Sequence, residues 1–192
     1  LSQDGDLQQV GWDGPEREVL WRYNQHYFDD LNAAEASRRA VWHRRLVHDW
    51  IRGNPPGQGI GWEPYPTSLR IVNWVKFFVA NPDAVEQSQL DSLFTQARWL
   101  RRNLEYHIRA NHYFENIKAL FFAGCYFTGE EARLWLTFAG RELEAQLMEQ
   151  ALPDGGHYER TPTYHCLMLR NYLELYSLAR THPGLLSTDS LE

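Results

Sequence analysis

The sequence predicts an all-α fold, and three observations support this prediction. Apolar residues recur at helical spacing in six segments, short breakers rich in Gly, Pro and Asn separate these segments, and no segment shows the alternating pattern of a strand. Consecutive helices with short connections pack as antiparallel hairpins. The periodicity leaves open whether the hairpins form a curved α/α array or an irregular bundle.

The expected elements follow the breakers. Residues 1–34 are expected to be an irregular lead-in. The expected helices span residues 35–51, 67 or 68 to 80, 84–110, 113–127, 130–150 and 162–180. Thr67 or Ser68 is the expected cap of the second helix, and Thr161 with Pro162 the expected start of the last. The second helix is apolar nearly all round, so we expect it to be buried, whereas the third carries Ile108 on its core stripe.

Composition excludes several classes of protein. The 192 residues carry a net charge of −6, which argues against a nucleic-acid partner, and they contain no run of about 18 apolar residues, so no membrane insertion is expected. Cys125 and Cys166 lie among apolar neighbours and are expected to be buried. Aromatic residues make up 14% of the chain, which fits either sugar-stacking surfaces or a tryptophan-rich core.

The first polar cluster lies in the breaker at 61–68. Two prolines would fix the backbone around Trp62, Glu63 and Tyr65. A rigid aromatic side chain beside a carboxylate is a reasonable wall for stacking a sugar ring. A packed loop of prolines and aromatic residues is the alternative.

The second polar cluster is Asn111-His112 with Glu115 and Asn116. In a helix that begins here, His112 shares a face with both Glu115 and Asn116. The free N–H groups of a helix N-terminus attract anions. Alternatively, Asn111 only caps the helix and His112 packs locally. The spacing is not that of a zinc-binding HExxH motif, and we predict neither a metal nor a cofactor.

The third polar cluster runs from Asp154 to His165. Tyr164 would fall in the first turn of the last helix, where the helix dipole and a nearby Arg160 or protonated His165 would favour its phenolate. Tyr164 is therefore a candidate base, although this segment taken by itself favours a turn with Tyr164 on the apolar stripe of the helix.

Four long segments resemble the heparinase II/III-like family of polysaccharide lyases, in its helical N-terminal domain. They are LWRYNQHYFDDL at 20–31, WIRGNPPGQGIGWEPYPTSLRIVNWVKFF at 50–78, NHYFENIKALFFAG at 111–124 and LPDGGHYERTPTYH at 152–165. The resemblance implies an incomplete α/α toroid over residues 35–192, followed in the whole enzyme by a β-sandwich domain that this chain lacks. It also implies cleavage of a uronic-acid polysaccharide by β-elimination.

The resemblance assigns roles residue by residue. Asn111 would neutralise the uronate carboxylate, His112 would be a base or a second neutralising group, and Tyr164 would be the acid and, in syn elimination, also the base. Glu115 matches a carboxylate of some members only, and Arg160 could pair with the substrate carboxylate. Further substrate contacts are expected from the first and third clusters, namely Trp62, Glu63, Tyr65 and His165, and Tyr113 is also placed in the sugar cleft.

The resemblance further implies an acidic polysaccharide and the chain's own C-terminal domain as partners, and a periplasmic or secreted location in a bacterium. Family enzymes draw another catalytic His from beyond this stretch, so the fragment alone need not be active. Segments 20–31 and 50–78 look like the branch found with surface-polysaccharide biosynthesis, so heparin specificity is not assumed. Two alternatives stay open: a non-catalytic carbohydrate-binding domain, and a toroidal glycoside hydrolase. The hydrolase would use two carboxylates about 5–9.5 Å apart, chosen from Glu63, Glu115, Asp154 and Glu159.

Overall fold

The computed structural model describes residues 6–108, 111–182 and 184, and it is all-α as predicted. The described part of the chain contains no strand, and one isolated antiparallel bridge joins Ala151 to His157. The α-helices are α1 (Leu7–Val10), α2 (Val19–Asn24), α3 (Ala40–Gly53), α4 (Pro64–Ala80), α5 (Gln87–Arg102), α6 (Asn111–Tyr126), α7 (Glu130–Gln150) and α8 (Pro162–Thr181). Short 3₁₀ turns are η1 (Asp29–Asn32), η2 (Ala36–Arg39), η3 (Ile60–Trp62) and η4 (Pro82–Ala84).

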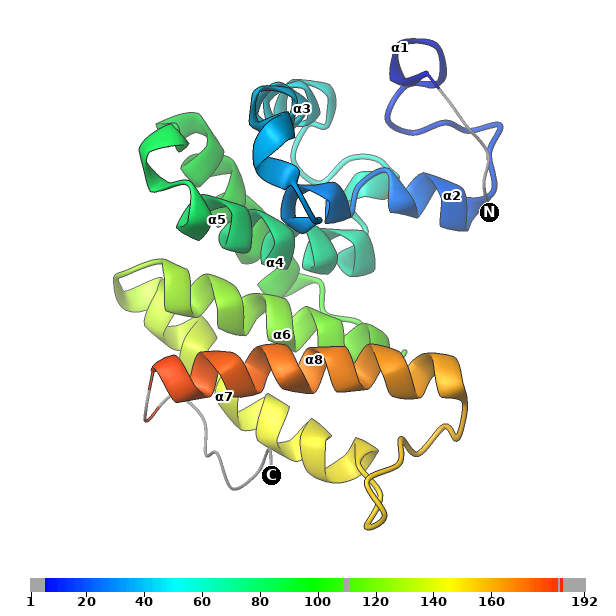
Figure 1. Ribbon diagram of the computed structural model, residues 1–192, viewed down its shortest axis with the longest axis vertical. Coiled ribbons are helices and arrows are strands. Elements are labelled where there is room, and N and C mark those ends of the chain that lie inside the picture. Colours follow the sequence, from blue (N-terminus) through cyan, green and yellow to red (C-terminus); the bar gives the residue numbers. More distant parts are fainter. Residues whose placement is uncertain (1–5, 109–110, 183, 185–192) are drawn as a thin grey trace.

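Helices α4, α6 and α8 lie side by side and run in the same direction, with α5 and α7 as the returning helices (Figure 1). The direction follows from pairs along the helices, because Asn116 of α6 bonds to Ser68 of α4 while Asn171 of α8 bonds to Glu115 of α6. Further along, Lys76 of α4 pairs with Glu174 of α8. The N-terminal ends of these three helices therefore lie at one end of the array.

The core is rich in tryptophan. Trp50 of α3 packs edge-on against Trp74 of α4 at 5.6 Å between ring centroids, and tilted against Trp62 at 5.9 Å. Residues before 35 contribute to this core, since Phe28 and Leu31 are buried and Phe28 contacts Trp74 at 5.4 Å. The expected irregular lead-in is thus partly helical and packs on the rest of the chain.

A fully buried arginine, Arg70 of α4, ties this segment to the helices. Its guanidinium donates to the carbonyls of Gly61, at 2.8 Å, and His26, at 3.4 Å, and to Gln96 Oε1, at 2.8 Å. It also lies 3.8 Å from the ring centroid of Trp50. One side chain therefore holds the backbone of η3, at Gly61, and the backbone of the segment before α3, at His26, against α4 and α5.

Helix boundaries agree with expectation where capping chemistry is clear. Helix α7 has the expected bounds, and Thr161 Oγ1 accepts from the backbone N–H of Tyr164 at 3.3 Å, with Pro162 in the first turn of α8. Helix α4 begins at Pro64, so the expected caps Thr67 and Ser68 lie inside it and are buried. Pro is tolerated in a first turn because the N–H there has no helical partner.

The third helix is shorter than expected. Helix α5 begins at Gln87 and ends at Arg102, and Ile108 is 40% exposed rather than part of the core. The chain leaves the helix because the backbone N–H of Glu105 donates to Asn116 Oδ1, at 2.9 Å. A side chain of α6 thus replaces the helical acceptor.

Two further expectations concern surface and burial. Cys166 is exposed on α8 and Cys125 is only half-buried, so the expectation of two buried thiols was wrong for Cys166. No helix in the described ranges is long and apolar enough to cross a membrane.

Candidate functional site

The N-terminal ends of the three parallel helices bring three clusters of side chains together. The ring of Tyr65, at the start of α4, stacks on His112, at the start of α6, with 4.3 Å between centroids and 24° between planes. Hydrogen bonding from the Asn111 side chain acts on the Tyr65 hydroxyl, and the charges of Tyr164 and Arg170 on α8 also act on it. Tyr65 therefore joins the starts of α4 and α6, and Tyr164 lies in the first turn of α8 at the same end of the array.

The pKa of Tyr65 is raised to about 12, chiefly because the hydroxyl is buried and also because Glu115 is near. Arg170 and the Asn111 side chain act in the opposite direction and do not offset these effects. The Tyr65 hydroxyl consequently keeps its proton at neutral pH and can donate a hydrogen bond to an anion.

A buried carboxylate orients His112. Glu105 Oε1 lies 3.1 Å from His112 Nδ1, and Glu105 Oε2 accepts from Asn116 Nδ2 at 3.1 Å. Asn116 in turn donates to Ser68 Oγ at 3.0 Å. With a carboxylate as its partner, Nδ1 carries a proton, and Nε2 is left for a ligand.

Glu105 was missed in the sequence because it lies seven residues before His112, beyond the end of α5. Nothing in the local sequence marks it, since its position depends on a bond to Asn116 across the turn. Only the rule that a functional His has an orienting partner could have prompted a search for a nearby carboxylate.

Glu115 lies beneath the site and is almost fully buried, with 3% exposure. Its Oε1 accepts from Asn171 Nδ2 at 2.7 Å, and its Oε2 lies 3.8 Å from Lys118 Nζ. The structure does not support the expected direct contact with substrate, because both oxygens face the interior between α6 and α8.

The expectation that Tyr113 forms an open wall of a sugar cleft is also not supported, whereas Trp62 is nearly buried but is among the residues that line the pocket beside His112. Trp62 is 2% exposed and donates to the Asn54 carbonyl at 3.0 Å, and Tyr113 is 6% exposed and donates to Glu142 Oε2 at 2.8 Å. Both rings pack in the core, which is the more favourable place for large aromatic surfaces.

The remaining predicted residues lie in two places. Glu63 is exposed and accepts a hydrogen bond from the Tyr23 hydroxyl near His112. Arg160 is exposed in the loop before α8, with φ of 54°. His165 lines a different pocket, against His157, because one residue along a helix turns the side chain by about 100° from Tyr164.

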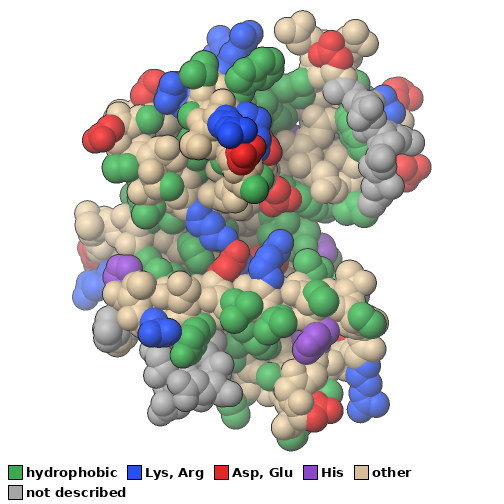
Figure 2. Space-filling model, in the orientation of Figure 1, with side chains coloured by type: hydrophobic (Ala, Val, Ile, Leu, Met, Phe, Trp, Pro, Cys, Tyr) green, Lys and Arg blue, Asp and Glu red, His purple; other side chains and the backbone are tan. Residues whose placement is uncertain are grey.

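A pocket of about 610 Å³ lies beside His112. Its lining residues include Tyr23, Glu63, Trp99, Glu105 and His112. Figure 2 shows the surface hollowed between the helices α2–α5 and the helices α6 and α8, with acidic and basic side chains along the hollow. Among the four residues Tyr65, Asn111, His112 and Tyr164, it is His112 that lines this pocket, which is large enough to hold part of a ligand.

Buried charges hold α8 in position. Glu174 pairs with both Lys76 and Lys118, and Lys118 also donates to Asn171 Oδ1 at 2.7 Å. Burial would raise the pKa of Glu174, but the two lysines outweigh this effect and hold the pKa below its usual value. Burial lowers the pKa of Lys76, and Glu174 opposes this shift.

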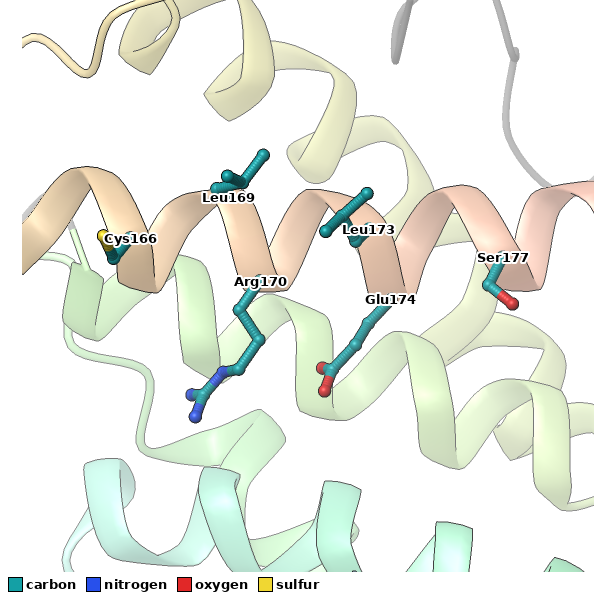
Figure 3. Close-up of a pocket in the computed structure, with 6 residues that line it drawn as sticks. All are labelled: Cys166, Leu169, Arg170, Leu173, Glu174 and Ser177. Atoms are coloured by element: carbon teal, nitrogen blue, oxygen red, sulfur yellow. The ribbon is translucent and has the colours of Figure 1, made fainter.

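Figure 3 shows that Arg170 and Glu174 extend from one side of α8 toward the other helices, whereas Leu169 and Leu173 extend from the opposite side. These side chains line an open pocket of about 430 Å³ along α8. No group of three or more His, Cys, Asp or Glu side chains in the described parts of the chain could hold a metal ion.

The fold is an incomplete α/α toroid, the helical architecture of heparinase-type lyases. The crystal structure of heparan sulfate lyase HepC from Pedobacter heparinus matches it with a TM-score of 0.68 at 18% identity, over 94% of this chain and 32% of that one. The profile of the family Heparinase II/III N-terminus matches residues 10–185, and the chain belongs to this family.

A curated relative shares the same region. FtsZ-localized protein C of Caulobacter vibrioides is 29% identical over 188 residues, which cover 91% of this chain and 32% of that protein. The chain therefore spans about a third of the length of both the relative and the solved lyase.

Proposed function

We propose that this chain is the helical domain of a polysaccharide lyase that cleaves a uronic-acid polysaccharide by β-elimination. The observation that carries the proposal is the stacking of Tyr65 on His112 where α4 and α6 begin, with Asn111 beside them and Tyr164 in the first turn of α8 at the same end of the array. Membership of the Heparinase II/III N-terminus family and the toroid fold support it. The acidic polysaccharide and the protein's further domain are the proposed partners.

The reaction needs the uronate carboxylate to be neutralised, because the C5 proton beside it is otherwise poorly acidic. Three helix N-termini with their free N–H groups favour an anion at this place. In the proposal, the Asn111 amide and the protonated Tyr65 hydroxyl donate to the carboxylate and stabilise the negative charge that develops when C5 loses its proton.

Proton transfer falls to His112 and Tyr164. The base removes the C5 proton, a double bond forms between C4 and C5, and the bond from C4 to the glycosidic oxygen breaks while the acid protonates that oxygen. His112, held by Glu105, offers Nε2 as the base or as a second donor to the carboxylate. Tyr164, which is 36% exposed, is the proposed acid and, in syn elimination, also the base.

The test uses the full-length protein and a panel of uronate polysaccharides, with ultraviolet absorbance of the unsaturated product followed beside new reducing ends. Tyr164→Phe is expected to lower turnover by at least about 100-fold, as loss of a general acid–base group does. Tyr176→Phe, a matched change further along α8, is expected to leave turnover unchanged. Wild-type turnover in Tyr164→Phe would contradict the role of Tyr164.

The same assay separates the alternatives. Hydrolysis would give reducing ends without absorbance, but two of its candidate carboxylates have other bonds: Glu115 with Asn171, and Asp154 with the backbone N–H of Gly156 at 2.9 Å. A binding domain without catalysis would give neither signal. The name of the Caulobacter vibrioides relative, which refers to localisation rather than to a reaction, favours keeping this second candidate.

We also propose export to the periplasm or the cell exterior, where a polysaccharide substrate is accessible. Cell fractionation of the full-length protein tests this, and recovery only in the cytosol would contradict it.

A further inference from the structure

The pocket beside His112 is acidic. Glu63 and Glu105 both line it, Glu105 being paired with His112, and the described residues of its lining also include His107 but no Lys or Arg. An anionic substrate would not be expected to enter such a pocket with its charged groups first.

Both carboxylates act on the pKa of the Tyr23 hydroxyl. The pKa of Tyr23 is raised, mainly by burial and then by its hydrogen bond to Glu63 and the charges of Glu63 and Glu105. Arg22 opposes this shift, but its guanidinium is bonded to Asp13 Oδ1 at 2.9 Å. Arg22 is therefore paired with Asp13 and is not among the described residues that line the pocket.

The walls of the pocket suit a sugar ring. Trp99 is half-buried there, and Gly57 and Gly59, each with φ of 74°, leave bare backbone at the rim. A Cβ on Gly57 would meet Trp99 Nε1 at 3.2 Å. An aromatic surface with carboxylate acceptors fits a ring that carries hydroxyl donors, and about 610 Å³ is in the usual range for a small-molecule site.

We propose that this pocket is the subsite for the sugar next to the attacked uronate, and that it takes a ring without sulfate or carboxylate. Glu63, whose carboxylate is exposed at the pocket, excludes an anionic ring by charge repulsion. The inference rests on the proposed function for the position of the uronate, since His112 borders both the pocket and the helix ends. Its selectivity can be measured without catalysis.

The experiment is calorimetric binding of matched tetrasaccharides to the full-length protein at low salt. Unsulfated chondroitin and heparosan fragments are compared with sulfated fragments of the same backbones. The unsulfated forms are expected to bind more tightly. Glu63→Gln keeps an acceptor for Tyr23 and is expected to reduce the ratio of the two affinities, unsulfated over sulfated, by about two- to fivefold, as loss of one exposed charge pair would. High salt should also reduce this ratio. Glu144→Gln removes an exposed carboxylate of α7 outside the pocket and should leave the ratio unchanged.

Each outcome of the binding experiment either supports or overturns the inference. Equal or tighter binding of the sulfated fragments would overturn the inference, as would a failure of every fragment to bind, or a Glu63→Gln variant with an unchanged ratio. Selective binding with no unsaturated product would keep the subsite and refute the proposed lyase activity instead.

Discussion

Two clusters of charged and polar side chains, one buried and one partly buried, hold the molecule together in different ways. The Arg70 cluster consists of Arg70, His26, Trp50 and Gln96, and the Lys118 cluster consists of Lys76, Lys118, Glu115, Glu174 and Asn171. Arg70 bonds to carbonyl, amide and hydroxyl oxygens and to no carboxylate of the described residues. Lys118, by contrast, pairs with carboxylates.

The attachment made by Arg70 therefore does not depend on the charge of its acceptors, whereas the attachment made by Lys118 does. Arg70 fastens the segment before α3 and η3 to the body of the fold through backbone carbonyls, which cannot change charge. The Lys118 cluster joins α8 to α4 and α6, and so sets where Tyr164 lies relative to Asn111 and His112. We therefore expect damage to the first cluster to unfold the chain, and damage to the second to disturb the site as well.

The largest expected effect is that of Arg70→Met. The change leaves the acceptors at Gly61, His26 and Gln96 buried without a donor, so we expect a loss on the order of 5 kcal/mol in the free energy of unfolding. Urea unfolding followed by circular dichroism measures it. Arg45→Met, at an exposed residue paired with Asp49, should cost less than about 0.5 kcal/mol. Similar losses in the free energy of unfolding for Arg70→Met and Arg45→Met would show that the bonds of Arg70 do not hold the fold together.

A smaller loss is expected for Lys118→Met, about 3–5 kcal/mol, because the buried Glu115 then loses the ammonium group that lies 3.8 Å from its Oε2. Adding Glu115→Gln removes that buried charge and should recover part of the loss. In the full-length protein, the single variant should also lower turnover. A double variant as unstable as the sum of the two single ones would mean that the two residues do not interact.

The smallest expected effect is a pH dependence in the Arg70 cluster. Burial, with help from Arg70, lowers the pKa of His26 to about 3, and its Nδ1 accepts from Trp50 Nε1 at 2.9 Å. Between pH 6.5 and 5 the unfolded chain binds a proton that the native state does not, so acidification to pH 5 removes about 2 kcal/mol, at about 1.4 kcal/mol per pH unit.

His26→Gln should start less stable at pH 7 and lose less stability on acidification, as measured by urea unfolding at pH 7 and pH 5. The exposed His107→Gln is the control, and its acid response should match that of the unchanged chain. An equal response in His26→Gln would refute the assignment.

The fold was predictable because helical periodicity and capping are local. Helix α7 and the start of α8 depend on turn residues and on the Thr161 cap, and both were predicted correctly. The end of α5 was not, because the acceptor that ends it belongs to Asn116, eleven residues further along. Local pattern does not report a partner supplied by another helix.

The candidate site was predictable only as residue types at breakers. The sequence indicated Asn111, His112 and Tyr164, and Tyr65 as a sugar-stacking ring, but neither the orienting partner Glu105 nor the stacking of Tyr65 on His112. We also expected Trp62 and Glu115 to contact substrate. Trp62 instead packs against Trp50 and is nearly buried, and Glu115 is buried beside Lys118. Catalytic roles for these residues stay predictions until the variants are measured.

The way in which α8 is attached affects the order in which the helices unfold locally. One side of this helix carries Leu169 and Leu173, which are 47% and 59% exposed, while α6 beneath it is almost wholly buried. We expect the amide hydrogens of α8 to exchange with solvent well before those of α6. Tyr164 would then leave in a local opening that keeps Asn111 and His112 in place, so a ligand that contacts both helices should slow exchange along α8 most.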